Sequence, residues 1–286
     1  MPRNDISAFV AEAAADVPDR QALVESGGRS LTWASLEDEV SRIATGLGVH
    51  GIRAGQRVMI AVGNRIEFVT AYLGVLRAQV VAVPVNPRSA PGEVARMVAD
   101  SGTRLVIADA TALDVVRAGL AELAADGEVP APIVVVVGAE PGEGEHAFAE
   151  LRADVVRPVP PLPDPEKLAA LLYTSGTSGR PRAAMLSHRA LLANIEQVAA
   201  VEPPMMHGDD VVLGVLPLFH VYGLNAVLGG VLRYRAKLLL VDLNAAGGAA
   251  RIVAFMGVGV LMLVVGYLAP LPPRTPAALN EQGDPA

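Results

Sequence analysis

The chain has 286 residues, of which 52% are hydrophobic and 19% are charged, and its formal net charge is -7. This composition excludes a largely disordered protein, because enough apolar side chains are present to build a large core. The acidic balance disfavours nucleic acid as a partner, since the sequence has no basic stripe to neutralise phosphates. The lack of cysteine excludes disulfides, a thiolate zinc site and a thiol nucleophile.

The first residues contain no apolar run typical of a signal peptide, so the sequence predicts a cytoplasmic protein. The mean hydropathy of +0.40 nevertheless raises the question of a membrane span. Residues 252–271 carry no charge over a length that suffices to cross a bilayer. Three glycines and Pro270 divide this run, and we favour a buried strand at about 258–265. A tail-anchored membrane protein remains an alternative.

From about residue 30, short runs rich in Val and Ile alternate with amphipathic segments. This alternation is typical of a doubly wound α/β fold, in which helices cover mostly parallel sheets. We expect strands at residues 58–62, 80–84, 105–108, 133–137, 168–173, 211–215 and 236–241. We expect helices at residues 32–50, 64–76, 93–99, 113–123, 187–201 and 221–232, and from residue 245. Asn64, with Glu67 three residues later, is predicted to cap the second helix.

A Pro-rich run at residues 158–165 predicts a stiff linker. We therefore expect a first α/β subdomain at residues 1–165 and an incomplete second one at 166–271 that holds a phosphate loop. Residues 272–286 are rich in proline and polar residues, and we expect a disordered tail.

The predicted strand at 168–173 leads into a loop with the composition of an anion-binding site. Glycines let main-chain N–H groups converge on an anion, and hydroxyls add donors. The loop residues are Thr174, Ser175, Gly176, Thr177, Ser178 and Gly179, and the cation Arg182 follows. The spacing fits neither a Walker loop nor a nucleophile elbow. A simple flexible loop is the alternative, but a loop at the end of a buried strand is where α/β sheets bind ligands.

The segment at residues 171–188, LLYTSGTSGRPRAAMLSH, closely resembles the phosphate-binding signature of the adenylate-forming superfamily of acyl-CoA synthetases, luciferases and peptide-synthetase adenylation domains. Residues 31–36, 71–87 and 216–224 resemble further signatures of this family in the same order. One departure is that Arg182-Ala183 stands where the family usually has Lys-Gly, which keeps the charge and changes its geometry.

The resemblance implies ATP-dependent activation of a fatty or related carboxylic acid to an acyl-adenylate, followed by thioester formation with coenzyme A. It implies that residues 174–179 cradle the outer phosphates of ATP and that Arg182 neutralises them. It further implies that Thr174 helps to hold Mg²⁺ and that His220 lines the site near the acyl carboxylate. Taken by itself, a histidine between Phe219 and Val221 would be read as part of the core.

The sequence contains no segment similar to the family's later Gly-Tyr-Gly-x-Thr-Glu or Tyr-Arg-Thr-Gly-Asp elements. We therefore expect a truncated acyl-CoA ligase-like protein whose activity alone is impaired, because positioning of the reactants supplies much of such catalysis. One alternative is a non-catalytic nucleotide- or acyl-binding remnant. Another is half of a split enzyme, completed by a separate chain that supplies the C-terminal part.

Overall fold

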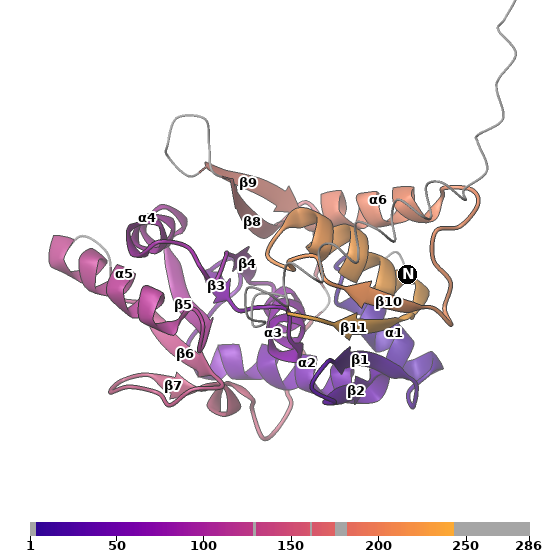
Figure 1. The fold of residues 1–286 in the computed structure, drawn as a ribbon, viewed down its shortest axis with the longest axis horizontal. Helices are drawn as coiled ribbons and strands as arrows, with labels where there is room; N and C mark the ends of the chain where they lie inside the picture. Colours follow the sequence, from indigo (N-terminus) through magenta and orange to yellow (C-terminus); the bar gives the residue numbers. More distant parts are fainter. Residues whose placement is uncertain (1–3, 128–129, 161, 175–181, 243–286) are drawn as a thin grey trace, which may run out of the picture. The chain divides into compact units, whose positions relative to one another are not determined.

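Two β-sheets with helices packed around them form the part of the chain described by this computed structural model, namely residues 4–127, 130–160, 162–174 and 182–242 (Figure 1). Within those ranges one sheet has seven strands and the other has four. Most neighbouring strands run parallel, and helices cover them. The predicted α/β fold is therefore confirmed.

The larger sheet has the strand order β7-β6-β5-β3-β4-β8-β9. Its strands are β3 (Arg57–Ala61), β4 (Val81–Pro84), β5 (Thr103–Asp109), β6 (Ile133–Val137), β7 (His146–Ala147), β8 (Leu168–Thr174) and β9 (Arg182–Ser187). All neighbours pair in parallel except β8 and β9, which form an antiparallel pair. The carboxyl ends of β4 and β8 consequently meet at one edge, where ligands bind in such sheets.

The smaller sheet has the order β10-β11-β1-β2 and joins segments that lie far apart in the sequence. Its strands are β1 (Gln21–Glu25), β2 (Ser30–Thr32), β10 (Val211–Gly214) and β11 (Lys237–Leu240). β1 pairs in parallel with β11, with Leu23 opposite Leu238. The N-terminal strands are thus built into the same sheet as residues that follow the phosphate loop.

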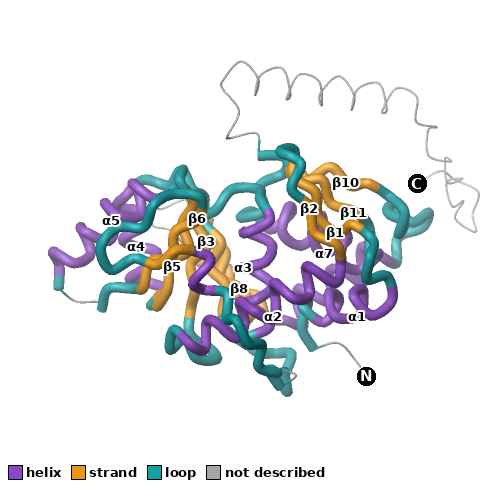
Figure 2. Tube along the Cα trace, turned by 90° about the horizontal axis from the view of Figure 1, so that it is seen from below, coloured by secondary structure: helices purple, strands orange, loops and turns teal. Residues whose placement is uncertain are grey.

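Helices cover both faces of the larger sheet and fill the space beside the smaller one (Figure 2). α4 (Pro91–Ser101) and α5 (Leu113–Asp126) pack together over one face. On the other face, α2 (Trp33–Val49) packs on α3 (Ile66–Arg77), which lies between the two sheets (Figures 1 and 2). The remaining helical segments are α1 (Ala8–Asp16), η1 (Phe148–Leu151), α6 (His188–Ala199), the π-helix η2 (Tyr222–Leu228) and α7 (Gly229–Tyr234).

The central strands of the larger sheet are largely apolar because both of their faces are covered. In β3, Val58 and Ile60 contribute to the core on the α2–α3 side, whereas Met59 and Ala61 contribute to the core on the α4–α5 side. A strand buried on both faces appears in the sequence as a continuous apolar run, which is why these strands were predictable. The predicted elements between residues 32 and 137, and those between 168 and 241, are present with small shifts in their ends.

Several local expectations were wrong. Asn64 does not cap α3: the cap position is Arg65, and the Asn64 side chain binds backbone groups of residues 214–218 instead. The expected helix at 221–232 starts as the π-helix η2 and continues as α7. Helix α1 and strands β1, β2, β7 and β9 were not predicted.

The predicted division near residue 165 stays a prediction, although strands on its two sides, β4 and β8, pair in one sheet. The predicted helix from residue 245, the strand at 258–265, the uncharged run 252–271 and the tail 272–286 lie outside the described residues. In the ranges that are described, every helix is too short or too polar to cross a lipid bilayer.

Candidate functional site

The predicted phosphate loop lies between two strands that the structure places side by side. Thr174 ends β8, Arg182 begins β9, and the two residues are direct partners in the antiparallel ladder. The Thr174 hydroxyl lies 3.4 Å from the Arg182 carbonyl oxygen. The intervening predicted residues Ser175, Gly176, Thr177, Ser178 and Gly179 lie outside the described residues, and their role stays a prediction. The loop therefore connects the two paired strands β8 and β9 at the carboxyl end of β8.

A cavity of about 310 Å³ brings Thr174 and His220 together, although they are remote in the sequence. It is formed by the end of β4 and the loop after it, one side of α4, the end of β8 and the loop before η2. Its lining residues are Pro84, Val85, Asn86, Ser89, Glu93, Met97, Tyr173, Thr174, Phe219 and His220. Two residues that the family resemblance implied, from two separate signatures, thus line one cavity.

Arg182 is exposed, and within the described ranges its guanidinium forms no ion pair with a carboxylate. Several other arginines do form ion pairs, for example Arg77 with Glu37 and Arg117 with Glu145. An arginine without a carboxylate partner is available to bind phosphate oxygens, for which its planar donor fork is well suited. The chemistry at the end of the hairpin therefore fits a polyphosphate.

The turn that carries His220 fixes the orientation and the tautomer of its ring. The backbone N–H of Tyr222 donates to His220 Nδ1 at 3.3 Å, so in the neutral ring Nδ1 is the acceptor and the proton sits on Nε2. Nε2 has no partner among the described residues. A side chain at Gly223 would collide with the carbonyl oxygen of Pro217, so this tight turn requires glycine. His220 is thereby able to present an N–H donor to an anion such as a carboxylate.

Tyr173 contributes a neutral hydroxyl group to the same cavity wall. Its hydroxyl donates to Asp100 Oδ2, and partial burial together with this bond raises its pKa well above the ordinary value. The phenol therefore stays protonated at every physiological pH, and its bond to Asp100 fixes β8 against α4. This contact was not anticipated from the sequence, in which Tyr173 appeared only as the first residue of the loop signature.

Asn64 is the residue near this site that sequence reasoning misassigned. Its side-chain amide donates to the carbonyl oxygens of Gly214 at 3.1 Å and of Leu216 at 2.9 Å. Its Oδ1 accepts the backbone N–H of Leu218 at 2.9 Å. Asn64 thus holds the segment that leads directly to Phe219 and His220. The only signal in the sequence was a short polar residue at the end of a buried strand.

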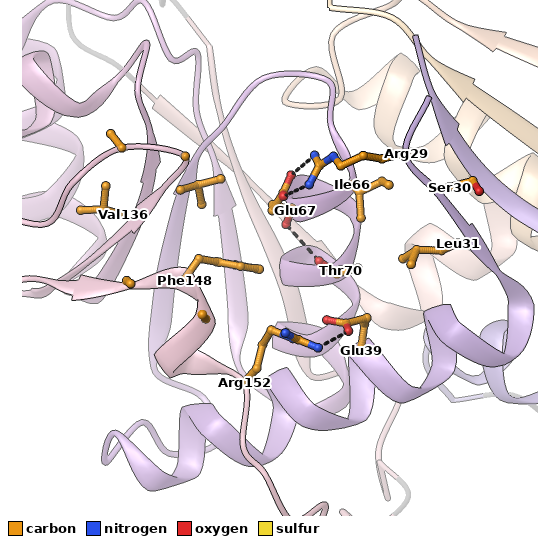
Figure 3. A pocket seen from close by; sticks show the side chains of 15 residues that line it. Arg29, Ser30, Leu31, Glu39, Ile66, Glu67, Thr70, Val136, Phe148 and Arg152 are labelled. Carbon is orange, nitrogen blue, oxygen red and sulfur yellow. Dashed lines mark hydrogen bonds and ion pairs between the residues drawn. The ribbon is translucent and has the colours of Figure 1, made fainter. Parts of the chain in front are cut away.

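A second, larger cavity of about 630 Å³ lies near the carboxyl end of β6, beside α3 (Figure 3). Apolar side chains such as Phe148 and Ile66 form its walls, and two ion pairs border it, Arg29–Glu67 and Arg152–Glu39 (Figure 3). None of the residues predicted for the site lines it.

The charged groups of this second cavity satisfy one another. Arg29 binds Glu67 at 2.6 Å and Glu25 at 2.7 Å, and the hydrogen bond to Glu67 is the main cause of its raised pKa. Burial by itself would raise the pKa of Glu67, but Arg29 and Arg65 outweigh burial and lower it. Glu25 also accepts the backbone N–H of Ile66 at the start of α3. These charges tie β1 to α3 and are not available to a ligand.

Two other histidines are accounted for without a catalytic role. His188 is 1% exposed at the first turn of α6, which Ser187 caps as expected. Burial lowers its pKa, with a smaller opposing effect from Asp5. His207 lies in an exposed turn beside Asp210, as predicted. In the described ranges no three or more His, Asp or Glu side chains form a cluster suited to a metal ion, and the assignment of Thr174 to Mg²⁺ stays a prediction.

The fold is the one expected of an adenylate-forming enzyme. The profile of the family described as AMP-binding enzyme matches residues 10–271, and the chain belongs to this family. Enzymes of this family that act as CoA ligases use ATP, Mg²⁺ and coenzyme A to activate small carboxylic acids.

Curated relatives include a 4-coumarate--CoA ligase-like protein of Oryza sativa subsp. japonica, 34% identical over 237 residues, which are 82% of this chain and 42% of that protein. The 4-coumarate--CoA ligase of Pinus taeda is 32% identical over 241 residues, which are 83% of this chain and 43% of that protein. The chain thus spans less than half the length of the curated relatives it matches.

Solved structures agree on the fold. An ATP-bound MatB from Rhodopseudomonas palustris has a TM-score of 0.70 and 25% identity, over 85% of this chain and 46% of that one. A putative long-chain-fatty-acid CoA ligase from the same species has a TM-score of 0.73 and 26% identity, over 84% of this chain and 58% of that one. An anthranilate CoA ligase in complex with anthranoyl-AMP has a TM-score of 0.75 at 20% identity, covering 85% of this chain and 46% of that one, and shows likeness of fold alone.

Proposed function

We propose that this chain is the nucleotide-binding and acid-binding portion of an AMP-forming acid–CoA ligase. The observation that carries this proposal is the cavity shared by Thr174 and His220, next to an arginine with no carboxylate partner in the described part of the chain. These residues provide donors for phosphate and carboxylate oxygens at one place. Such preorganised donors stabilise the charges that develop in acyl and phosphoryl transfer.

In the first half of the proposed reaction, a carboxylate oxygen attacks the α-phosphorus of ATP, and the bond to the β-phosphate breaks to release pyrophosphate. Residues 174–179 and Arg182 would bind the leaving phosphates, and His220 would orient the carboxylate through Nε2–H. Mg²⁺, with Thr174 as one proposed ligand, would supply neutralisation of phosphate charge. In the second half, the thiol of coenzyme A attacks the acyl carbon and AMP leaves.

The proposed acid has an apolar body. One sequence relative named above is a 4-coumarate--CoA ligase, and one structural neighbour is described as a putative long-chain-fatty-acid CoA ligase. Phe219, Val85 and Met97 give this chain's cavity apolar walls beside His220. We therefore propose an aryl or fatty carboxylic acid, and a cytoplasmic location where ATP and coenzyme A are present.

The chain covers less than half of its relatives, and this observation favours a second candidate function, binding without turnover. In that case the chain holds the nucleotide or the acid and needs a separate chain for catalysis. Both functions require the same hairpin and cavity, but only the first requires turnover.

The test is to incubate the purified chain with ATP, Mg²⁺ and a panel of aryl and fatty acids while pyrophosphate release is followed, and to measure ATP binding by calorimetry. We expect binding that Arg182→Gln weakens, and slow or no turnover. Turnover at ordinary enzymatic rates would show that this portion is self-sufficient. No heat on titration with ATP would contradict both functions.

A further inference from the structure

The loop that carries His220 is hydrogen-bonded to the segment after β3 through the side chain of Asn64. Asn64 is the third residue after the end of β3 and is 8% exposed. Its amide makes hydrogen bonds of 2.9–3.1 Å to the backbone of Gly214, Leu216 and Leu218, and a longer one of 3.5 Å to the carbonyl oxygen of Val241. Gly214 is also held by its pairing with β11, so Asn64 acts mainly on the geometry of residues 215–218.

Asn64 is itself held from both sides. The N–H of Gly63 donates to Asp109 Oδ2 at the end of β5, at 2.8 Å. The N–H of Ile66 donates to Glu25 Oε1 of β1, at 2.7 Å. The backbone around Asn64 is thus fixed to a neighbouring strand of one sheet and to a strand of the other. A side chain on such a rigid base can transmit a defined position to the loop it binds.

Only asparagine provides the required set of groups at this depth. The site needs two donors for the carbonyl oxygens and one acceptor for the N–H of Leu218, all within the reach of a short side chain. Serine has one donor, aspartate has none when ionised, and glutamine is one carbon longer. An apolar residue would remove the partner of the carbonyl oxygen of Leu216 and of the N–H of Leu218, whereas the carbonyl oxygen of Gly214 would keep the N–H of Val241.

The contact continues from Leu218 to the histidine ring. Leu218 is 1% exposed, so its position is fixed by packing as well as by Asn64. The N–H of His220 donates to the carbonyl oxygen of Pro217 at 3.1 Å. The N–H of Leu224 donates to the carbonyl oxygen of His220 at 2.9 Å. The turn from Pro217 to Leu224 therefore moves as one unit with the segment that Asn64 binds.

We propose that Asn64 is the positioning residue of His220. By binding residues 214–218, Asn64 sets the conformation of the turn that carries His220. In that turn the N–H of Tyr222 bonds to Nδ1 of His220, which favours the tautomer with its proton on Nε2. The value of that tautomer to catalysis rests on the proposed function, whereas the positioning itself does not. Asn64 touches no reacting group and acts only through the loop.

The test is nitrogen-15 NMR of the histidine side chains at pH 8, where the neutral ring is observed. The signal of His220 is assigned by its loss in His220→Gln. In the unaltered chain we expect Nδ1 without a proton and Nε2 with one. In Asn64→Ala we expect a mixture of tautomers, together with a roughly tenfold faster hydrogen exchange of the Leu218 amide, because one buried hydrogen bond is lost.

A second variant keeps the test decisive if Asn64→Ala folds poorly. In Asn64→Asp the introduced carboxyl faces two carbonyl oxygens, and Asp109 and Asp242 lie beside the preceding Gly63. Arg65 is engaged by Glu67 and offers little compensation. These surroundings raise the pKa of the introduced carboxyl. Ionised, this carboxyl still accepts the N–H of Leu218 but repels the carbonyl oxygens of Gly214 and Leu216, whereas the protonated form donates one hydrogen bond to them. Relative to the parent at the same pH, protection of the Leu218 amide should therefore be lower at pH 8 than at low pH.

The matched control is Thr45→Val, which removes a side chain 7% exposed on α2 that bonds to Ser41 and Arg157. It should lower stability without changing the His220 signal. An unchanged His220 tautomer in Asn64→Ala, or an equal change in Thr45→Val, would overturn the proposal. If the chain binds no ATP but the tautomer responds as expected, the proposed function fails and the positioning role stands.

Discussion

The two cavities at the carboxyl edge of the larger sheet differ in size and, more importantly, in how their charged groups are engaged. The larger cavity, beside β6 and α3, is bordered by arginines that are already paired with Glu25, Glu39 and Glu67 (Figure 3). The smaller one holds His220 with an Nε2 that no described residue binds, and lies next to Arg182. Volume alone would select the larger cavity, whereas the polar groups without a partner among the described residues favour the smaller cavity, which we propose as the binding site.

The largest effect is expected where the backbone is most constrained, at Gly223 in the turn of the smaller cavity. Gly223→Val places a side chain against the carbonyl oxygen of Pro217 and should cost about 3 kcal/mol, by overpacking. Urea denaturation measures the loss, and ATP and acid binding should fall with it. The control Gly48→Ala, in α2 where no atom lies near the added group, should stabilise by about 0.5–1 kcal/mol. A Gly223→Val chain as stable as the parent would show that the turn is not tight.

At the larger cavity, Arg29→Ala should destabilise the fold by about 2 kcal/mol while leaving ligand binding unchanged, because it strands the largely buried Glu67. Denaturation and calorimetry with ATP separate the two effects. Arg189→Ala, which breaks an exposed pair with Glu166, serves as the control and should cost little. A marked loss of ATP affinity in Arg29→Ala would remove the distinction between the cavities.

Arg182→Gln should weaken ATP binding about tenfold, or about 1.4 kcal/mol, with little change in stability, since Arg182 is exposed and a charge-assisted bond to phosphate is lost. Arg189→Gln is the matched control, an exposed arginine near the start of α6 that pairs with Glu166. Both variants are compared by calorimetry at one salt concentration. Equal affinities in the two variants would place the phosphates elsewhere.

The smallest effect concerns pH. His188 is buried at the start of α6. Its lowered pKa means that the folded chain resists a proton which the unfolded chain accepts below about pH 6.5. Stability should therefore be complete above that pH and decline as the pH falls, by at most about 1.4 kcal/mol per unit. His188→Phe should flatten the decline between pH 7 and pH 5 in thermal unfolding, whereas His207→Gln at an exposed turn should not. A parallel decline in all three chains would assign the acid sensitivity to other groups.

The sequence predicted best what local pattern determines. The apolar run Val58–Val62 predicted a strand because both faces of that strand are covered. The signatures around Thr174 and His220 predicted site residues, and these two residues line one cavity. β1 was missed because it pairs with β11, which lies far along the chain, and the local sequence around β1 does not indicate this pairing.

Asn64 shows the same limit at the site. Its spacing to Glu67 matched a capping box, but the hydrogen bonds to residues 214–218 took the amide away from the helix. The local sequence is compatible both with capping α3 and with binding a distant backbone segment, and the tertiary contacts decide in favour of the second role. The roles of residues 175–179 stay predictions of the signature.

The parallel pairing of β1 with β11 has a consequence for how the chain acquires its structure during synthesis. The larger sheet from β3 to β9 is complete once residue 187 has been made, whereas β1 and β2 emerge first and wait for residues 237–240. Closing so long a loop is slow and favours late docking. A nascent chain halted between those points would carry an assembled sheet and an unpaired N-terminal hairpin, the form most exposed to chaperones and to aggregation through its free strand edge.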